Sequence, residues 1–594
     1  MINGFGVNKM DVKDEVKKIF GAKKERQKKF KNHASQSTVQ VKRLDNYSDD
    51  LLKALEEYAD EIDSAILPYN RKSTEKTMMV TGIRKSSQET TNRKTHMDNA
   101  AGIAVEIAKK LGLCVGATRV IARYHDIGHT FYGHPGERWL SNVKEDLGIG
   151  YYKHNALGPQ ELIYQRNIYD EIIKRIKEFN PDIKDKELSR IKKSLWLIFD
   201  GINAHNGEKT ETEFKPDKAK TEARFKEELL NCFAIKDFDK TIVPATMEGC
   251  LIRLCDKISY IPYDMVDGIR EGFIDKIDGE YIPTLVALGI TKDEIKRCNA
   301  KRNYDLIIRK LQISLTKNVI RNSTSTAIRM SKDVSKHLHE LRNINNKRIV
   351  KYTILAEDNE VYPMAIKELM NKFASLTLKS GVLEELEYGE IDLLDAKRLI
   401  EKYEGTPYED FARYLADMSH EDYEFTQEMV YMALRHSIGR EQEIARQIVL
   451  GKREFIEEPG YENRASRIRE YIQFYQGEEI SENYSQYDIN DDIDRELSRQ
   501  ELKEAGQGLE HKIALEIGAR YLSKLNDFEF FNLLKTTGLI TEEQANSLSR
   551  TYREIGQDGL KTEVNMQKEL QELIQVQQED SERIGIDQTE HDER

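Results

Sequence analysis

Proline and long apolar runs are both scarce in this 594-residue chain. The 11 prolines leave room for many uninterrupted helices, because proline breaks the interior of a helix. No run of about 18 apolar residues occurs, and the first residues, MINGFGVNKMDVKDEVKK, contain no apolar signal-peptide region. We therefore expect a helical, cytoplasmic protein that neither crosses a membrane nor binds one.

Cysteine is also rare, and its pattern excludes two kinds of small scaffold. There are 5 cysteines, an odd number with no CxxC spacing, at positions 114, 232, 250, 255 and 298. An oxidised disulfide framework needs paired cysteines, and a zinc ribbon needs closely spaced ones. The sequence therefore predicts buried thiols.

Positive charge is in deficit, with 92 Lys and Arg against 104 Asp and Glu and a net charge of −12. A protein that mainly binds nucleic acid needs a local positive excess, so nucleic acid is not expected as the main ligand. One stretch is an exception, KKIFGAKKERQKKFKNH at 17–33. It is either a solvated helix, the favoured interpretation, or a docking site for phosphates, nucleic acid or a partner subunit.

The chain length predicts two to four domains, since single hydrophobic cores stop growing well below this size. Apolar residues recur at intervals of three and four in stretches such as IAVEIAKKLGL and LIRLCDKISYIPYDMV, which is the helical period. Strand-like alternation is scarce, and RIVKYTIL at 348–355 is its best candidate. The sequence predicts an all-α fold.

Changes in composition suggest five segments. Nearly all candidate chemistry lies in a core region, which is followed by further helical segments and an acidic, apolar-poor tail that we expect to be disordered. The expected boundaries are a basic leader at 1–50, the core at 51–345, a mostly helical region at 346–480, an additional helical extension at 481–575 and the tail at 576–594.

The stretch RYHDIGHTFYGHPGE at 123–137 concentrates histidines, acids and glycines. Val120, Ile121 and Tyr124 form a helical apolar face that precedes it, which places His125 and Asp126 at the last helical turn. Neighbouring helical side chains point about 100° apart, so these two grip one ion only where a helix ends. Imidazole with carboxylate suits a divalent transition metal or Mg²⁺, but at least two more ligands are needed.

One candidate ligand lies upstream, in TNRKTHMDNAAGIAVEIAKKLG. His96 shares a helical face with apolar residues such as Ala100 and Ile107, so it points inward near the start of a helix. A lone inward histidine is more often a satisfied core residue than a ligand, and this alternative stays open.

A second candidate lies downstream, in MEGCLIRLCDKISYIPYDMVDGIREG. Asp256, Tyr260, Asp264 and Asp267 form a polar stripe beside an apolar one. Acids on such a helix are costly to bury unless they meet cations or donors. A solvated acidic face is a reasonable alternative for Asp264 and Asp267, but it fits Asp256 less well.

Taken in order, these motifs resemble those of the HD-domain metal-dependent phosphohydrolases. His96, His125-Asp126 and Asp256 match the H…HD…D signature, and HDIGHTFYGHPGE resembles the HDxGHxPxGHxGE stretch of the deoxyguanosine triphosphate triphosphohydrolase family. EGCLIRLCDKISYIPYDMVDGIREG resembles that family's ADxIAYxxHDxxD helix, and the resemblance extends over roughly residues 65–430. It implies an HD-domain helical core at 51–345 with a family-associated region after it.

The resemblance implies that His96, His125, Asp126 and Asp256 hold a divalent metal ion. Mn²⁺, Mg²⁺, Fe²⁺, Co²⁺ and Zn²⁺ all accept such ligands, and a second ion could bridge through Asp126. The implied reaction cleaves the bond between the 5′-oxygen and the α-phosphorus of a deoxynucleoside triphosphate, with dGTP as the preferred substrate. Its products are a deoxynucleoside and inorganic triphosphate.

Further roles follow from the same resemblance. Arg93 and Lys257 would balance the charge of the triphosphate, Tyr260 would bond to a phosphate oxygen, and Asp264 would accept from the sugar 3′-hydroxyl. The leaving 5′-alkoxide needs a proton donor, and the pair of His134 and Glu137 matches the family's general acid.

For three other positions an ordinary structural histidine is the alternative to a functional one: a loop histidine for His129 and His154, and a helix-end residue for His205. His129 would orient water or bind phosphate, and His154 matches a family histidine that contacts phosphate. His205, in FDGINAHNGEK, is either functional or merely a residue at a helix end. Met78 stands where the family has a glutamine that contacts the base, which leaves base specificity open because Met is a poor hydrogen-bonding group.

Two alternatives to this interpretation remain. Another HD phosphodiesterase or alarmone hydrolase would be expected to carry HDIGK or HDxxED, whereas this chain has His129 in that motif. A nucleotide-binding regulatory protein without turnover is the other, although all four expected ligands are present. The family further implies a homotetramer or homohexamer, an allosteric nucleotide, and a role in dNTP pool control or antiviral defence.

Overall fold

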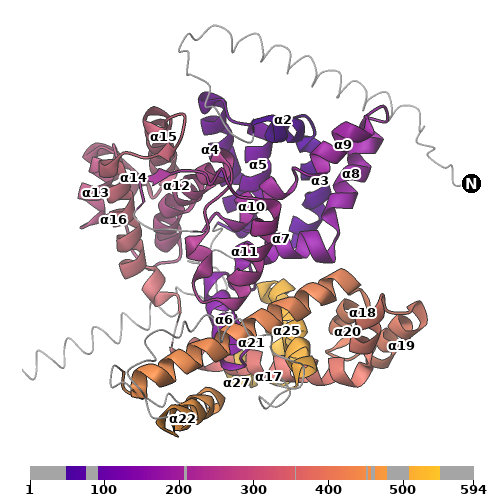
Figure 1. Ribbon diagram of the computed structural model, residues 1–594. Helices are drawn as coiled ribbons and strands as arrows, with labels where there is room; N and C mark the ends of the chain where they lie inside the picture. The colour runs from indigo at the N-terminus through magenta and orange to yellow at the C-terminus, as the bar shows by residue number, and fades with distance from the viewer. Residues whose placement is uncertain are drawn as a thin grey trace, which may run out of the picture. The chain divides into compact units, whose positions relative to one another are not determined.

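The computed structural model describes residues 49–74, 76, 91–206, 211–354, 356–449, 453–455, 462–477 and 508–548. The basic stretch at 17–33, Met78 and the acidic tail lie outside these ranges, as do parts of the expected extension at 481–575. Figure 1 shows the course of the described helices.

Helices dominate the described chain, which confirms the predicted all-α fold. Its two strands, β1 (Glu213–Phe214) and β2 (Ile328–Arg329), form one short antiparallel pair in which Glu213 faces Arg329. The strand expected at 348–355 is wrong, because α16 (Lys332–Arg348) runs into this stretch and a 3₁₀ turn, η5 (Val350–Tyr352), follows. The β-branched Ile349 is fully buried against Gly268, so it serves packing and has no strand partner.

Four helices make the framework of the core: α4 (Arg93–Leu111), α5 (Val115–Tyr124), α10 (Trp196–Asn203) and α12 (Met247–Arg270). α4 begins where the Asn92 side chain accepts a hydrogen bond from the Thr95 amide at 2.8 Å, and it ends at Gly112 in the left-handed conformation. α12 packs against α4, α5 and α10.

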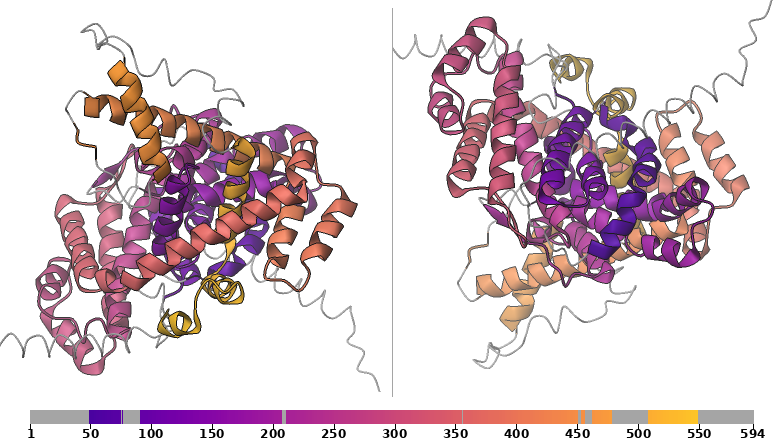
Figure 2. Two further views of the ribbon diagram at one scale, coloured as in Figure 1. Left: turned by 90° about the horizontal axis from the view of Figure 1, so that it is seen from below. Right: turned by 90° about the horizontal axis from the view of Figure 1, so that it is seen from above.

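The other helices of the core and of the region after it surround this framework (Figures 1 and 2). Before α12 they are α2 (Asp49–Glu57), α3 (Ala59–Ile66), η2 (Leu67–Thr74), α6 (His134–Asp146), α7 (His154–Gln160), the π-helix η3 (Glu161–Gln165), α8 (Ile168–Phe179), α9 (Asp185–Lys192), α11 (Glu222–Ala234) and η4 (Phe238–Thr241). After α12 they are α13 (Tyr281–Ala287), α14 (Lys292–Lys301), α15 (Asp305–Asn322), α17 (Ala356–Ser380), α18 (Val382–Tyr388), α19 (Leu393–Tyr403), α20 (Glu409–Ala416), α21 (His420–Val449) and α22 (Glu462–Gly477).

The described part of the C-terminal region, residues 508–548, contains the helices α25 (Leu509–Lys524), α26 (Asp527–Thr536) and α27 (Glu542–Leu548). α25 crosses between α17 and α21 (Figure 2), and most of its residues are buried, including Lys512, Glu516 and Arg520. A helix with charged residues inside the fold needs polar partners there. This element is therefore part of the protein's interior.

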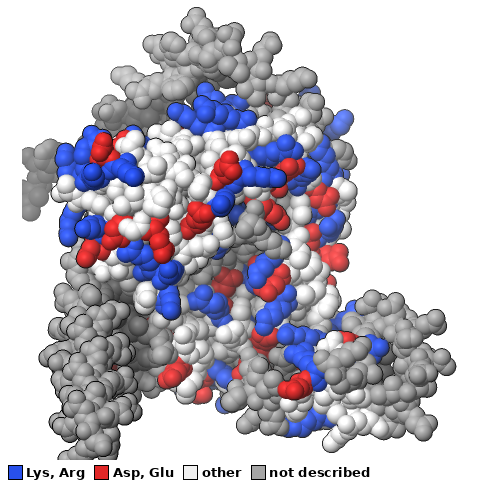
Figure 3. Space-filling view, turned by 90° about the vertical axis from the view of Figure 1, so that its left-hand side faces the viewer, with Lys and Arg blue, Asp and Glu red and all other residues white. Residues whose placement is uncertain are grey.

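Charged side chains are spread over the described surface, as the scarcity of long apolar runs leads us to expect. On the side that carries α13 to α16, Lys and Arg side chains alternate with Asp and Glu over a mostly uncharged face (Figure 3). None of the described helices is both long and apolar enough to span a membrane. The five cysteines are free thiols, four of them buried.

Candidate active site

A cavity of about 750 Å³ lies where α4, α6, α7 and α12 meet. It is lined by nine of the twelve residues that the sequence predicted: Arg93, His96, Asp126, His134, Glu137, His154, Asp256, Tyr260 and Asp264. His125 and His129 are fully buried directly behind this lining. The volume is within the range usual for sites that bind small molecules.

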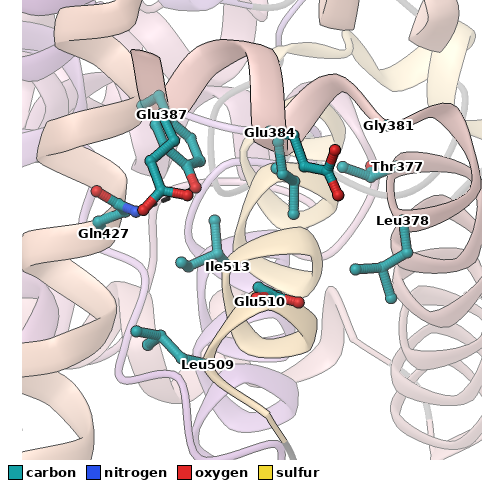
Figure 4. Close-up of a pocket in the computed structure, with 11 residues that line it drawn as sticks. Thr377, Leu378, Gly381, Glu384, Glu387, Gln427, Leu509, Glu510 and Ile513 are labelled. Carbon is teal, nitrogen blue, oxygen red and sulfur yellow. Dashed lines mark hydrogen bonds between the residues drawn. The ribbon is translucent and has the colours of Figure 1, made fainter. Parts of the chain in front are cut away.

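A much smaller cavity, of about 110 Å³, lies between α17, α18, α21 and α25. Figure 4 shows Ile513 and Leu509 of α25 facing Glu384 and Glu387 of α18 across it. Its volume is well below the roughly 300 Å³ at which ligand pockets begin. The larger cavity, which also gathers the residues predicted from the sequence, is therefore the candidate site.

The first group in the large cavity brings together His96, His125, Asp126 and Asp256. Nε2 of His96 lies 3.2 Å from Nε2 of His125 and 3.1 Å from Oδ1 of Asp256. Oδ2 of Asp126 lies 3.4 Å from Nε2 of His96 and 3.6 Å from Nε2 of His125. The structure thus brings the four predicted ligands close to one another from α4, α12 and the turn after α5.

Local sequence explains how each ligand reaches this point. His96 lies on the first turn of α4, just after the Asn92 cap, and Asp256 lies at the middle of α12. α5 ends at Tyr124, so His125 and Asp126 occupy the turn directly after the helix, one residue beyond the expected last turn. Leaving the helix allows two adjacent side chains to face the same point.

Hydrogen bonds to Nδ1 of the two histidines orient their Nε2 lone pairs toward the other ligands. Nδ1 of His125 donates to the carbonyl of Ala122 at 2.7 Å. The Ser259 hydroxyl donates to the Asp256 carbonyl at 2.7 Å, so its oxygen accepts from Nδ1 of His96 at 3.0 Å. With the Nδ1 hydrogen bonds arranged in this way, each imidazole in its neutral form presents an unprotonated Nε2 to the centre.

Four lone-pair donors that face one another fit a divalent cation. Ligand atoms about 2.1 Å from an ion lie about 3.0 to 3.4 Å apart in octahedral or tetrahedral sites. The observed separations of 3.1 to 3.6 Å match this spacing. The residues present can therefore hold a metal ion.

The charges of the group support the same conclusion. Burial alone would raise the pKa of Asp126, but His125 and the Arg93 guanidinium, 2.6 Å away, hold it well below its usual range. Burial would likewise raise the pKa of Asp256, but the neighbouring His125 and His96 lower it. Two carboxylates thus remain ionised beside the Arg93 guanidinium. Burial would lower the pKa of His96, but Asp126 and Asp256 raise it, so this buried group attracts positive charge.

A second group shares Asp126 with the first. Nε2 of His154 and Nε2 of His205 lie 3.2 Å apart, and they lie 3.6 and 3.5 Å from Oδ1 of Asp126. Nδ1 of His205 donates to the Ile202 carbonyl at 2.7 Å and Nδ1 of His154 bonds to Glu137 at 2.8 Å. Both Nε2 atoms again offer lone pairs, and these three residues could hold a second ion.

His205 is the residue that the sequence left open. It follows α10, whose apolar residues are all buried, and its ring lies 5.0 Å from that of His125 between centroids. The only local feature that could mark His205 as functional is the sequence HNG after an apolar helix. Its partner His154 is far away in the chain, so spacing alone could not join them.

His134 and His154 meet at one carboxylate oxygen. α6 begins at His134, and Oε2 of Glu137 lies 3.3 Å from Nδ1 of His134 and 2.8 Å from Nδ1 of His154. Burial would raise the pKa of Glu137, but His154 and His134 hold it well below its usual range. A charged carboxylate therefore links the two imidazoles and fixes a proton on each Nδ1.

His129 lies behind this pair. Its ring stacks on that of His154 at 3.7 Å, and Nε2 lies 3.5 Å from Oδ1 of Asp126. Burial, with the cationic Arg93 nearby, lowers its pKa well below the usual value, so the ring is neutral. Lys76 donates a hydrogen bond to its carbonyl. Among the described residues, neither ring nitrogen has a hydrogen-bond partner.

Asp264 and Asp267 are not on a solvated face, so that alternative is wrong for both. Asp264 lines the cavity, and burial together with the neighbouring Asp267 raises its pKa well above the usual value. Asp267 is buried and accepts hydrogen bonds from the Thr91 amide at 3.1 Å and from Arg270 at 3.0 Å. The polar stripe of α12 faces inward because other helices cover it.

Lys257 lies apart from the other predicted residues. Its ammonium is 5.8 Å from the centroid of the Phe214 ring, and it is not part of the cavity lining. Burial lowers its pKa to about 8.

Three lysines that the sequence analysis did not select line the cavity near His154: Lys153, Lys236 and Lys240. Lys153 pairs with Asp239 at 3.0 Å, and Lys236 pairs with Glu145 at 2.8 Å. Lys153 lies in a loop, and Lys236 and Lys240 lie much later in the chain, in a turn and in the short 3₁₀ helix η4. They add positive charge to a cavity that already contains Arg93.

An all-α protein with a buried His/Asp group that can hold a metal ion is the class that these observations define. No protein-family model matches the chain. A protein of Geobacter metallireducens is 28% identical over 272 residues, which are 45% of this chain and 59% of that protein. A protein of Bradyrhizobium sp. is 31% identical over 196 residues, which are 33% of this chain and 42% of that protein.

Both relatives carry the name deoxyguanosinetriphosphate triphosphohydrolase-like protein, as does a Rhodopseudomonas palustris protein that is 28% identical over 255 residues. The chain thus matches less than two thirds of the length of each of these relatives. The similarity is distant, and it agrees with the family to which the sequence motifs point.

Proposed function

We propose that this protein is a metal-dependent deoxynucleoside triphosphate triphosphohydrolase that releases a deoxynucleoside and inorganic triphosphate, with dGTP as the preferred substrate. One observation carries the proposal: His96, His125, Asp126 and Asp256 converge in the same cavity as the hydrogen-bonded pair of His134 and Glu137. A ligand group beside a proton donor is what phosphoester hydrolysis requires.

The four converging residues would hold the divalent ion, whose chemistry when bound is to polarise a phosphoryl oxygen. Arg93, whose guanidinium lies 2.6 Å from Asp126, and the lysines near His154 would balance the charge of the triphosphate. Tyr260 would hydrogen-bond to a phosphate oxygen. Asp264 would share a hydrogen bond with the sugar 3′-hydroxyl.

His134 would protonate the departing 5′-oxygen. Glu137 accepts a hydrogen bond from Nδ1 of His134. The other ring nitrogen, Nε2, is therefore the atom that can pass a proton to the substrate. The hydrogen bond from His154 to the same carboxylate fixes the orientation of Glu137. Neutral His129 and His154 would contact phosphate or orient the attacking water.

The second group favours one alternative within the same superfamily. Asp126, His154 and His205 could hold an additional ion, and paired ions are typical of enzymes that hydrolyse phosphodiesters or phosphomonoesters. The other alternative is a nucleotide-binding regulatory protein without turnover. The products of the reaction separate these three functions.

The decisive experiment incubates the protein with each dNTP and with GTP, in Mn²⁺ and in Mg²⁺, and resolves the products by anion exchange. His125→Ala and Asp126→Ala remove ligands, and His420→Ala, on α21 and outside the cavity lining, is the matched control. Inorganic triphosphate with a deoxynucleoside, lost in both ligand variants but not in His420→Ala, supports the proposal. Monophosphate with pyrophosphate would move the protein to a different hydrolase class.

The proposal also includes an assembly and a regulator. A homotetramer or homohexamer and activation by a second nucleotide are proposed on resemblance alone. Light scattering of the full chain, with and without mixed dNTPs, measures the mass directly. Turnover of one dNTP that depends on the presence of another would identify the effector. A role in dNTP pool control or antiviral defence would follow from loss of dNTPs in cells that express the protein.

A further inference from the structure

Two C-terminal helices contact both ends of α6, the helix whose first turn carries His134 and Glu137. We call α25 and α26, residues 509–536, the C-terminal clamp. Several hundred residues separate the clamp from α6 along the chain, so every contact between them is a product of tertiary folding.

At the C-terminal end of α6 the contact is a buried ion pair. Lys144 lies 2.8 Å from Glu516, and both side chains are almost fully buried. The Lys144 ammonium also donates to the Tyr151 carbonyl at 2.8 Å, and Lys512 donates to the Leu147 carbonyl just after the helix. A buried pair is favourable only when its geometry is satisfied, so it specifies where α6 lies relative to α25.

At the N-terminal end the clamp contacts Phe131 and Tyr132, two of the three residues that precede His134. The amide of Tyr132 donates to Oδ1 of Asp527 at 2.6 Å, and the Phe131 ring stacks on Phe530 with centroids 3.6 Å apart. Tyr132 has a φ of 53°, and Gly133 has a φ of 58°. A tyrosine in the left-handed region is uncommon and persists only where its surroundings determine it.

The clamp is itself fixed on its other side. Arg520 of α25 lies 2.6 Å from Asp422 of α21 and also donates to Thr426. Lys524 donates to Gln165 of η3. These bonds hold α25, and α26, which carries Asp527 and Phe530, follows α25 after only two residues.

From this geometry we infer that Asp527 and Phe530 are positioning residues for His134. They hold residues 131–133 in the conformation that begins α6 at His134 and sets its imidazole against Glu137. The inference rests on the proposed function in one respect, since it takes His134 as the proton donor. It assigns a part in the active site to a segment outside the core region.

The test uses four variants of the full chain: Asp527→Ala, Asp527→Asn, Phe530→Leu and Phe528→Ala. Asn keeps an oxygen that accepts from the Tyr132 amide, whereas Ala does not. Phe528 lies on the same helix but is 71% exposed, so its replacement is the matched control. Phe530→Leu keeps the site apolar and removes the ring stacking.

The first measurement is steady-state turnover of dGTP together with bound Mn²⁺. Asp527→Ala should lower kcat about tenfold or more and leave KM and the metal content near the wild-type values, because misplacement of a catalytic group by about 1 Å can slow a reaction 100-fold. Asp527→Asn should keep most of the wild-type kcat. The kcat of Phe530→Leu should lie between those of Asp527→Ala and Asp527→Asn. Equal losses in Asn and Ala, or no loss in either, would overturn the inference.

The second measurement is amide hydrogen exchange, which needs no turnover. Peptides that cover residues 129–137 should exchange faster in Asp527→Ala and Phe530→Leu, while peptides from α12 keep the wild-type rate. Unchanged protection of 129–137 in both variants would contradict the inference. If the wild-type protein does not hydrolyse dNTPs, the proposed function fails, and the exchange data still decide whether the clamp holds this segment.

Discussion

The Nε2 atoms of His96 and His125 face each other at 3.2 Å inside the protein. Nδ1 of His125 donates to a carbonyl and Nδ1 of His96 donates to a hydroxyl. When the two rings are neutral, both facing Nε2 atoms therefore present lone pairs. Two lone pairs in contact repel unless a cation lies between them. The carboxylates of Asp126 and Asp256 surround the same point, so the arrangement is stable only with positive charge.

Metal removal should therefore lower the stability of the protein. An ion that binds only the folded state adds about 2.7 kcal/mol of stability when its free concentration is 100 times Kd. Differential scanning fluorimetry should show a higher Tm in Mn²⁺ than in excess EDTA. His125→Ala should abolish this difference and His420→Ala should preserve it. The same Tm in both buffers for the wild-type protein would contradict metal binding.

Replacement of His205 by Ala should separate the two groups. His205 belongs to the second group and lies outside the first, so the first ion should remain bound. Loss of a residue at such a site typically lowers activity about 10- to 100-fold. The measurement is kcat for dGTP together with the metal content of the purified variant. Full activity in His205→Ala would show that the second group has no role in turnover.

The first group could be predicted from the sequence because each part has a local signal. His125 and Asp126 are adjacent, His96 lies on an apolar helical face, and the stripe that contains Asp256 has a helical spacing. The resemblance to a known family joined these parts. His205 lacked a local partner, and only the packing of α10 against its neighbours brings it to His154.

The role of α25 could not be predicted for a related physical reason. Lys512, Glu516 and Arg520 repeat every four residues, which is the usual pattern of a solvated helix face. Each has a partner that is distant in the chain, such as Lys144 for Glu516. Periodicity reports that charges share a face, but it does not report whether a partner covers that face.

Asp264 should make the stability depend on pH in a defined direction. Burial and Asp267 raise the folded-state pKa of Asp264 above the unfolded value of about 3.9, so its favourable contribution is complete below that pH. The contribution is lost as the pH rises through the folded-state pKa, because the carboxyl must then ionise in a buried place. Asp264→Asn should therefore be more stable than wild type at pH 7, by a margin that shrinks toward pH 4.

Urea unfolding at several pH values between 4 and 8 measures this margin. Asp293→Asn, an exposed position on α14, is the control and should show no such margin. In the proposed function Asp264 contacts the sugar, so the stabilised variant should also have a higher KM for dGTP. If Asp264→Asn and the wild-type protein had the same stability at every pH, Asp264 would ionise freely in the folded protein.

The buried pair of Arg520 and Asp422 should dominate the attachment of α25. The two groups lie 2.6 Å apart with side chains 3% and 0% exposed, and Gln160 also donates to Asp422 at 3.0 Å. Removal of one partner of a buried pair typically costs about 3 to 5 kcal/mol, because the other charge stays buried without compensation. Asp422→Ala should therefore lower the free energy of urea unfolding by about this amount.

A double variant distinguishes the effect of an unpaired buried charge from the effect of the side-chain volume that Asp422→Ala removes. Asp422→Leu with Arg520→Met replaces both charges by apolar side chains, so no unpaired charge remains and much of the stability should return. Arg413→Ala breaks an exposed ion pair with Glu409 on α20 and should change the stability far less. If the double variant were as unstable as Asp422→Ala, the buried charge would not be the cause. The pair would then act through its hydrogen bonds to Thr426 and Gln160, which the double variant also removes.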